Sequence, residues 1–293
     1  MKRSMVGVVR LVVVFAVLGL LLAASATAGE KRYRDKIFKV TVKRGIVYGS
    51  GVIGTYGERE DLALDLYKPK RDKVKRRPVA VWVHGGGFAF GDKGSGPSAQ
   101  LARRFARMGY VTVSINYRLL VEGGCSGATG IAIECYRAAI EGTHDAQAAV
   151  RWLRANAKRL RVDPKRIGIG GESAGAIISA GVGVLSAQPG ESGNPGFPSD
   201  VGASVSISGG LPGGLFVDDE TAPGIMFAST GDPIVPYVWS VETFDAMTAL
   251  GIPAKLTTFE SNVHVPWEQY RALITKQARN FLYRQLDLAD APQ

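Results

Sequence analysis

The chain has 293 residues, enough for one large α/β domain, and its 46% apolar and 21% charged residues are typical of a globular rather than a disordered protein. The formal net charge is +10, but no zinc finger, basic zipper or RNA-binding signature accompanies it, so no nucleic-acid partner is expected. The basic clusters KRYRDK and KPKRDKVKRR are expected to form a solvated surface, with binding of anionic glycans or a membrane surface as the alternative.

Residues 1–28 have the pattern of a cleavable secretory signal peptide. A basic start is followed by an apolar run over 11–24 and by the small-residue sequence ATA at 26–28. The run is shorter than the ~20 residues of a membrane span, and an uncleaved anchor is the alternative. We therefore expect cleavage after Ala28, a secreted or periplasmic catalytic domain over 29–293, and no stable membrane span after processing.

Strands and helices alternate along the rest of the chain. Apolar runs or alternating patterns predict strands, and apolar spacings of three and four predict helices. The predicted strands cover 37–47, 62–67, 79–84, 110–117, part of 163–171, 203–208, 224–230 and 254–259, and the main predicted helices cover 98–108, 143–157, 174–185 and 267–286. About eight strands, the first two antiparallel, predict one α/β domain with a mostly parallel sheet and helices on both faces.

The sequence GIGGESAGA contains a G-x-S-x-G motif between a predicted strand and a predicted helix. This context is that of a nucleophile elbow, a tight turn that exposes a serine at the top of the sheet. Side chains two residues to either side of Ser173 would collide there, so Gly171 and Gly175 are expected to be required. The alternative is a glycine-rich turn without chemistry. Dinucleotide and Walker phosphate-binding motifs are excluded, because their required residues are absent.

A serine is a poor nucleophile and needs a base. In this arrangement the order along the chain is serine, acid, histidine, and His264 is the only histidine after Ser173. The acid should follow a strand between them, which favours Asp232 in IMFASTGDPIVP. The alternatives are a surface or core role for His264 and an ordinary Asp-Pro turn at Asp232. The predicted catalytic triad is therefore Ser173, Asp232 and His264.

The sequence VHGGGFAFG places three glycines after the third predicted strand. Acyl transfer builds an oxyanion, and backbone N–H groups must point at it. We expect Gly86, Gly87 and Ala174 to supply these groups as the oxyanion hole. His84 and Gly85 are expected to support the loop rather than to take part in catalysis.

Four more side chains are expected to shape the site. Phe88 and Phe90 are predicted to pack so that they fix the glycine loop. Cys125 and Cys135 lie in a glycine-rich segment, and a disulfide is the simplest expectation for an exported protein, with two free thiols as the alternative. A zinc site is not expected, because no pair of histidines lies nearby. The segment between the two cysteines is expected to form part of the rim.

Taken together, the sequence resembles the α/β-hydrolase superfamily over nearly all of the chain after residue 28. The resemblance rests on VHGGGFAFGDK, VSINYRL, DAQAAVRWLRANA, DPKRIGIGGESAGA, GDPIVP and SNVHVP. It is closest to bacterial esterases of the hormone-sensitive-lipase-like and feruloyl/acetyl-xylan-esterase-like groups. The resemblance implies the same triad and oxyanion hole, and structural roles for Tyr117 and Asp145. Only a short loop lies at 209–223, so little or no cap domain and a rather open site are expected.

The expected activity is that of a secreted serine carboxylesterase that works through an acyl-enzyme, with no metal or organic cofactor. The expected substrate is a small-molecule or polymer-linked ester, and short acyl esters or ester decorations of plant polymers suit an open site. One alternative is a serine formamidase, amidase or peptidase with the same triad. A more remote alternative is a non-catalytic binding module on the same fold.

Overall fold

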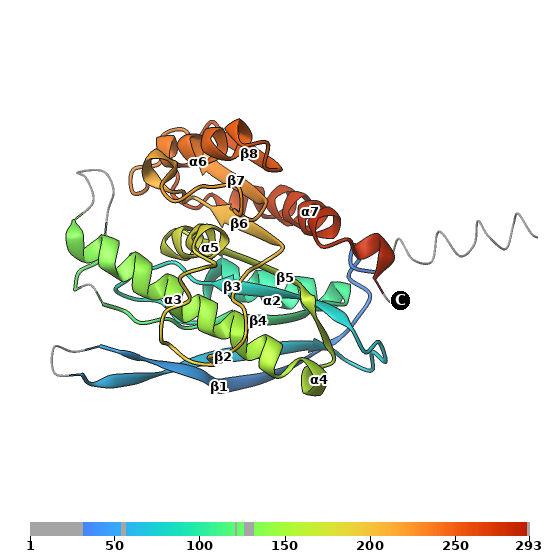
Figure 1. Cartoon of the computed structure of the whole chain (residues 1–293). Helices are drawn as coiled ribbons and strands as arrows, with labels where there is room; N and C mark the ends of the chain where they lie inside the picture. Colours follow the sequence, from blue (N-terminus) through green and yellow to red (C-terminus); the bar gives the residue numbers. More distant parts are fainter. Residues whose placement is uncertain (1–31, 54–56, 121, 126–131, 292–293) are drawn as a thin grey trace, which may run out of the picture.

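The computed structural model describes residues 32–53, 57–120, 122–125 and 132–291 (Figure 1). The expected signal peptide at 1–28 lies outside the described residues. Within them, no helix is long and apolar enough to cross a membrane.

An eight-stranded sheet runs through the described chain (Figure 1). Its strands are β1 (Val40–Val52), β2 (Arg59–Pro69), β3 (Arg77–Val83), β4 (Val111–Ile115), β5 (Val162–Glu172), β6 (Ala203–Ile207), β7 (Gly224–Ser229) and β8 (Ala254–Phe259). Their spatial order is β1-β2-β4-β3-β5-β6-β7-β8. The β1–β2 and β2–β4 pairs are antiparallel and all the others are parallel. The predicted fold class, a mostly parallel sheet that begins with antiparallel strands, is confirmed.

Helices cover both faces of this sheet. The helices of the described residues are α2 (Gly96–Met108), α3 (Ile133–Ala155), α4 (Ala157–Leu160), α5 (Ala174–Val184), α6 (Tyr237–Ala249) and α7 (Trp267–Gln285), with short 3-10 turns η1 (Pro212–Gly214) and η2 (Leu288–Asp290). Helices α3, α5 and α6 pack on one face, and α2 and α7 on the other (Figure 1).

The β3 strand shows why the sheet is buried on both sides. Val79, Val81 and Val83 belong to the core beneath α3 and α5, whereas Ala80 and Trp82 belong to the core beneath α2 and α7. Successive side chains of a strand point to opposite faces, so a strand covered on both faces must be apolar at every position. This explains the unbroken apolar run of β3 and places its carboxyl end, where the glycine loop begins, at the centre of the molecule.

Helix α3 begins at Ile133, ten residues before its predicted start at 143. Its first turns have few buried residues, and Gly142 lowers helix propensity, so the apolar periodicity that marks a helix is missing there. A Cβ at Gly142 would lie 2.7 Å from Cδ1 of Ile178, so α3 approaches α5 closely at this point. Packing against α5 accounts for this segment of α3 better than helix propensity does.

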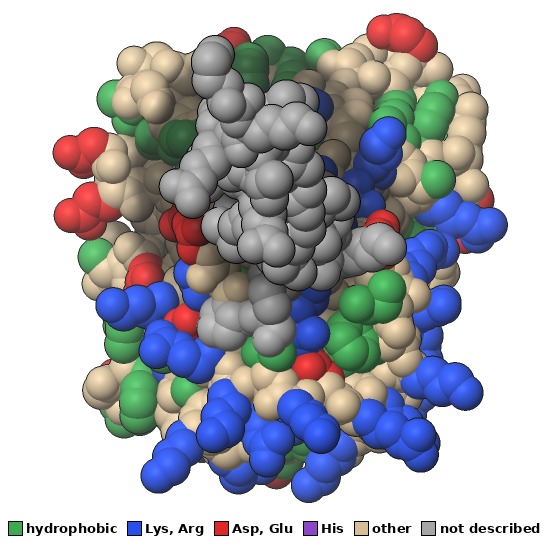
Figure 2. Space-filling model, turned by 90° about the vertical axis from the view of Figure 1, so that its right-hand side faces the viewer, with side chains coloured by type: hydrophobic (Ala, Val, Ile, Leu, Met, Phe, Trp, Pro, Cys, Tyr) green, Lys and Arg blue, Asp and Glu red, His purple; other side chains and the backbone are tan. Residues whose placement is uncertain are grey.

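Lys and Arg side chains gather on the lower part of the face shown in Figure 2. One basic group there consists of the β2–β3 connection over 70–76 together with α4, around a hollow lined by Lys75, Arg76, Lys158 and Arg161 among others. This connection enters β3 at its amino end. The basic surface therefore lies at the end of the parallel strands opposite to their carboxyl ends.

Candidate active site

Three side chains that are far apart in the sequence meet at the carboxyl ends of the strands. Ser173 directly follows β5, Asp232 follows β7 and His264 follows β8. His264 Nε2 lies 2.8 Å from Ser173 Oγ, and His264 Nδ1 lies 2.7 and 2.9 Å from the two carboxylate oxygens of Asp232. The structure thus brings together the three residues that the sequence predicts as a triad.

Ser173 lies in a strained turn between β5 and α5. Its φ of 55° and ψ of −123° are unusual for a residue with a side chain. A Cβ at Gly171 would lie 2.4 Å from the carbonyl oxygen of Gly175, and a Cβ at Gly175 would lie 2.2 Å from that of Val83. Both glycines are therefore needed for the turn. The turn exposes the hydroxyl at the amino end of α5, where the helix dipole favours negative charge.

Asp232 is held in a polar turn. Its side chain is only 2% exposed, and Oδ1 accepts hydrogen bonds from the backbone N–H groups of Ile234 (2.9 Å) and Val235 (3.0 Å). These two donors fix the orientation of the carboxylate. The carboxylate thereby faces the imidazole of His264.

The loop that carries His264 is fixed by two serine side chains from neighbouring strand ends. Ser229 Oγ donates a hydrogen bond of 2.8 Å to the carbonyl of Val263, and the N–H of Val265 donates one of 3.1 Å to Ser208 Oγ. One bond lies on each side of His264. Together they anchor the position of the ring between Asp232 and the elbow.

The glycine loop after β3 has a backbone conformation that favours glycine. Gly86 has a φ of 120° and Gly87 a φ of 57°. A Cβ at Gly86 would lie 1.8 Å from the carbonyl oxygen of Phe90. The three-glycine sequence therefore has a steric cause, since a side chain at Gly86 would displace the loop.

The backbone N–H groups of the glycine loop and of Ala174, at the start of α5, differ in whether they have a hydrogen-bond partner. The N–H of Gly85 donates to the carboxyl group of Glu172. Those of Gly86, Gly87 and Ala174 have no hydrogen-bond partner within the described residues. The last three are thus available to a ligand oxygen beside Ser173, and they are the three that the sequence predicts as oxyanion donors.

His84 is buried beneath the loop. Its Nδ1 hydrogen bonds with the carbonyl of Gly85 at 2.7 Å, its ring stacks on Tyr117 at 4.6 Å between centroids, and burial lowers its pKa. The Tyr117 hydroxyl donates to the His84 carbonyl at 3.1 Å. These contacts support the loop, as the sequence predicts for His84, and give Tyr117 the structural role that the resemblance implies.

Phe88 and Phe90 differ in how far they are buried. Phe88 is buried and packs against Tyr117 at 6.3 Å between centroids, which agrees with its predicted role in fixing the loop. The prediction for Phe90 is wrong, because its side chain is 62% exposed. The carbonyl oxygen of Phe90 makes the closest approach to the Gly86 position, and the ring of Phe90 lies at the surface beside Gly86 and Gly124.

Asp145 has the structural role that the resemblance implies. It is fully buried on α3, and its carboxylate accepts hydrogen bonds from the backbone N–H and the guanidinium of Arg118 and from the Ser192 hydroxyl. Arg118 follows Tyr117 after β4. The ion pair therefore ties the segment beneath the glycine loop to α3.

Glu172 is the functional neighbour that the sequence analysis missed. Its buried carboxyl group hydrogen bonds with the Ser98 hydroxyl and accepts the backbone N–H groups of Gly85 and Ser98. Burial raises its pKa to about 7. The signal in the sequence was an acidic residue at the end of the isoleucine and glycine run over 167–171, directly before the elbow serine.

Cys125 and Cys135 form a disulfide with a Cα–Cα distance of 5.9 Å, which confirms the predicted pairing. The N–H of Cys125 donates a hydrogen bond of 3.0 Å to the carbonyl of Gly87. The disulfide therefore connects the glycine loop to the first turn of α3.

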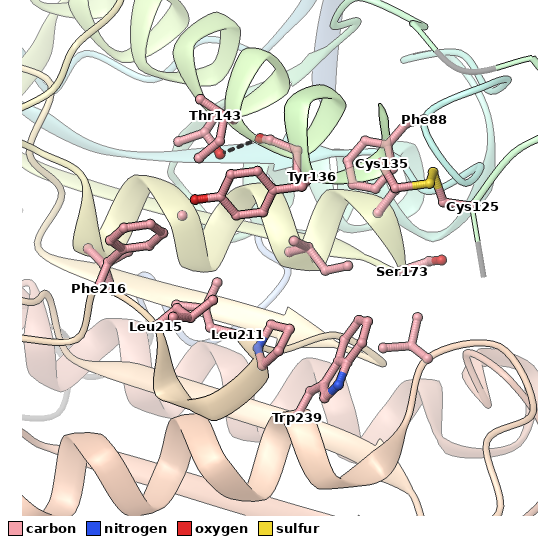
Figure 3. A pocket seen from close by; sticks show the side chains of 18 of the residues that line it. Phe88, Cys125, Cys135, Tyr136, Thr143, Ser173, Leu211, Leu215, Phe216 and Trp239 are labelled. Carbon is pink, nitrogen blue, oxygen red and sulfur yellow. Dashed lines mark hydrogen bonds between the residues drawn. A yellow bond between two sulfur atoms is a disulfide. The ribbon is translucent and has the colours of Figure 1, made fainter. Parts of the chain in front are cut away.

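Two pockets open on different sides of Ser173. The first runs between α3, α5 and the loop over 209–223 (Figure 3). The second is lined by Gly85, Gly86, Gly87, Phe90, Glu172 and His264 among others. No group of three or more His, Cys, Asp or Glu side chains that could hold a metal ion occurs in the described part of the chain.

Comparisons with known proteins find esterases and lipases among the similar sequences and structures. A family model described as BD-FAE matches residues 64–201. The chain is similar to secreted lipase 5 of Gibberella zeae, with 32% identity over 166 residues, which cover 53% of this chain and 30% of the lipase. It is also similar to phenmedipham hydrolase of Pseudarthrobacter oxydans, with 37% identity over 138 residues, which cover 45% of this chain and 26% of the hydrolase. The chain thus spans less than a third of the length of these curated relatives.

Solved structures show the same fold over most of both chains. Esterase 2 of Thermogutta terrifontis, phosphorylated by paraoxon, has a TM-score of 0.67 and 23% identity, and the match covers 84% of this chain and 94% of the esterase. A truncated carbohydrate esterase from gut microbiota has a TM-score of 0.67 and 19% identity, with 86% and 98% covered. The chain therefore has the fold of these esterases, and its residues 64–201 match the BD-FAE family model.

Proposed function

We propose that the protein is a serine carboxylesterase in which Ser173 attacks the carbonyl carbon of an ester. The observation that carries the proposal is the continuous hydrogen-bonded chain from Ser173 Oγ through His264 to Asp232. A serine hydroxyl becomes nucleophilic when a histidine accepts its proton and a carboxylate stabilises the resulting imidazolium.

The reaction follows from the positions of these groups. His264 Nε2 takes the proton of Ser173 as the Ser173 oxygen bonds to the carbonyl carbon, and Asp232 stabilises the positive ring. The N–H groups of Gly86, Gly87 and Ala174 stabilise the oxyanion. His264 then gives the proton to the departing alkoxide oxygen, which leaves as the alcohol. In the second half of the reaction His264 takes a proton from water as the water oxygen attacks the acyl carbon, and it returns that proton to Ser173 Oγ as the acid leaves.

An ester is favoured over an amide by what the relatives are named and bind. Esterase 2 of Thermogutta terrifontis has been seen with propionate and with butyrate bound. An amidase or peptidase uses the same triad, so amide hydrolysis is an outcome to be measured. A non-catalytic binding module is not favoured, because each expected position of the triad carries the required side chain.

We also propose that the protein is exported and that residues 1–28 are removed. The signal-peptide pattern supports this, and the Cys125–Cys135 disulfide is of the kind that forms in oxidising compartments. The mass and amino-terminal sequence of the protein recovered from the medium or periplasm test it. A protein that is retained in the cell with residues 1–28 intact would contradict it.

The decisive test is Ser173→Ala, assayed with p-nitrophenyl acetate and with a matched acetanilide. The wild type should hydrolyse the ester much faster than the anilide, and kcat for the ester should fall by about 10⁴-fold or more in the variant. The matched control is Ser95→Ala, which changes an exposed serine outside the site. Ester hydrolysis that survives in Ser173→Ala contradicts the mechanism, and a faster anilide reaction would favour the amidase.

A further inference from the structure

We propose that the acyl group of the substrate is an unbranched aliphatic chain of medium length that lies in an apolar channel along α5. The alcohol part of the ester lies on the other side of Ser173. This inference rests on the proposed function and names its substrate class. It differs from the expectation of short acyl groups in an open site.

One face of α5 forms the floor of the channel. Ala174, Ile177, Gly181 and Val184 line it at spacings of three, four and three, so they lie on one side of the helix. At 1.5 Å of rise per residue, the distance from Ala174 to Gly181 is ~10 Å and that to Val184 is ~15 Å. The channel therefore has the length of a medium acyl chain, well beyond that of an acetyl group.

Helix α3 and the loop over 209–223 form the opposite walls. The lining side chains of α3 are Tyr136, Ala139, Ile140 and Thr143, and those of the loop are Leu211, Pro212, Leu215 and Phe216. In Figure 3, Ser173 lies at one end of this channel and Phe216 at the other, with Tyr136 and Leu211 between them. A loop too short for a cap domain is thus long enough to cover an acyl chain.

The chemistry of the walls favours an alkyl chain. No charged side chain of the described residues lines the channel, and the Thr143 hydroxyl already donates to the Ala139 carbonyl at 2.8 Å (Figure 3). Besides Ser173 and Thr143, the described lining residues offer only the Tyr136 hydroxyl and the Trp239 N–H as polar side-chain groups, so a charged or sugar-like acyl group would lose most of its hydrogen bonds to water there. Each methylene that enters instead gains up to about fourfold in binding.

The position of His264 decides which part of the ester enters the channel. His264 lines the second pocket and not the channel, whereas Ala174 lines only the channel. His264 must protonate the departing alcohol oxygen, so the alcohol leaves through the second pocket. Cys125 lines both pockets and holds the carbonyl of Gly87, so the disulfide forms part of the partition between them.

A pair of isomeric esters tests the assignment directly. Ethyl hexanoate and hexyl acetate contain the same atoms and similar leaving groups, but the six-carbon chain is on opposite sides of the ester bond. We expect kcat/KM to be at least about tenfold higher for ethyl hexanoate. For p-nitrophenyl esters, kcat/KM should rise about two- to fourfold per methylene from acetate to hexanoate.

Two variants should shorten the channel at different depths. Ile177→Trp fills it about one turn from Ser173 and should reduce the ethyl hexanoate to hexyl acetate ratio to about one. Val184→Trp fills the far end and should lower the p-nitrophenyl decanoate to hexanoate ratio by about tenfold. The control is Leu250→Trp, an exposed position outside both pockets, which should preserve both ratios. Thermal unfolding checks that each variant is folded.

The outcomes separate the inference from the proposed function. If the wild type hydrolyses p-nitrophenyl acetate but prefers hexyl acetate to ethyl hexanoate, the channel assignment is wrong and the esterase proposal stands. If the folded wild type hydrolyses no ester, the proposed function fails and the inference fails with it. The isomer pair is measured on the wild type, so it decides even where a tryptophan variant does not fold.

Discussion

Two carboxyl groups lie beside the elbow serine, and they differ in burial and in contact with His264. Asp232 lies in a turn where two backbone N–H groups and His264 contact its oxygens. Glu172 lies at the buried end of β5, where burial raises its pKa to about 7. Both carboxyl groups accept backbone N–H groups, but for Glu172 the desolvation outweighs these hydrogen bonds and favours the neutral acid. The same functional group can therefore stabilise the imidazolium in one place and serve as a neutral link in the other.

The contacts of Ser98 indicate which form Glu172 takes. Ser98 Oγ lies 2.7 Å from the carbonyl oxygen of Val83 and also hydrogen bonds with Glu172 Oε2. A hydroxyl carries one proton, so both contacts are satisfied only when Glu172 supplies the second. Protonated Glu172 then connects β3, α2 and, through the N–H of Gly85, the glycine loop. It does so without placing a negative charge beside the oxyanion.

The largest effect should come from Asp232→Asn, which replaces the carboxylate in contact with His264 by an amide. An amide cannot stabilise the imidazolium, and it favours the wrong tautomer of His264, so kcat should fall by about 10⁴-fold. Steady-state kinetics with p-nitrophenyl acetate measure this. Asp218→Asn, in the loop before β7, is the control and should keep wild-type kcat. A loss of less than about tenfold in Asp232→Asn would remove Asp232 from the triad.

The second-largest effect is expected in Glu172→Gln, which should change how the free energy of unfolding depends on pH. The pKa of about 7 lies above the ordinary 4.5, so the folded protein holds this proton where the unfolded chain has released it. The contribution of Glu172 to stability is full below pH 4.5 and is lost as the pH rises through about 7. A shift of that size corresponds to on the order of 3 kcal/mol. Glutamine cannot ionise, so the variant should gain stability over the wild type by up to this amount at pH 9 and differ little at pH 5.

Urea unfolding at both pH values measures this difference. Tyr117 and His264 are the neighbouring titratable groups, and they are common to both proteins, so the difference isolates Glu172. Glu268→Gln is the control, because Glu268 lies on the surface of α7 with 78% of its side chain exposed. Equal pH dependence in the wild type and Glu172→Gln would show that Glu172 is ionised throughout.

The contrast between the two carboxyl groups also marks what the sequence can predict. Asp232 was found because chain order and the position after a strand are local signals, and the elbow motif fixes where the triad must meet. The state of Glu172 depends on Ser98 from α2 and on Gly85 from another loop. No pattern in the sequence reports such contacts, although the motif GESAG contains the residue itself.

The channel was missed for a similar reason. Its walls come from α3, α5 and the loop over 209–223, and the sequence showed only that this loop is too short for a cap domain. The start of α3 was also missed, because its first turns have little apolar periodicity and depend on packing against Ile178. Elements that carry their own periodicity or motif were predicted, whereas surfaces assembled from several elements were not.

The smallest effect, and the sharpest test of the neutral link, is expected from Ser98→Ala. If Ser98 accepts the proton of neutral Glu172, its loss should lower the free energy of unfolding by about 1–2 kcal/mol at pH 5. The loss should be larger at pH 9, where the Ser98 hydroxyl donates to the ionised carboxylate, because a hydrogen bond to a charged group is worth more than one to a neutral acid. Ser179→Ala is the matched control, because Ser179 is equally buried and donates to the Gly175 carbonyl within α5, so its loss should not depend on pH. A Ser98→Ala loss that is the same at pH 5 and pH 9 would contradict the change of Glu172 from neutral acid to carboxylate over this range.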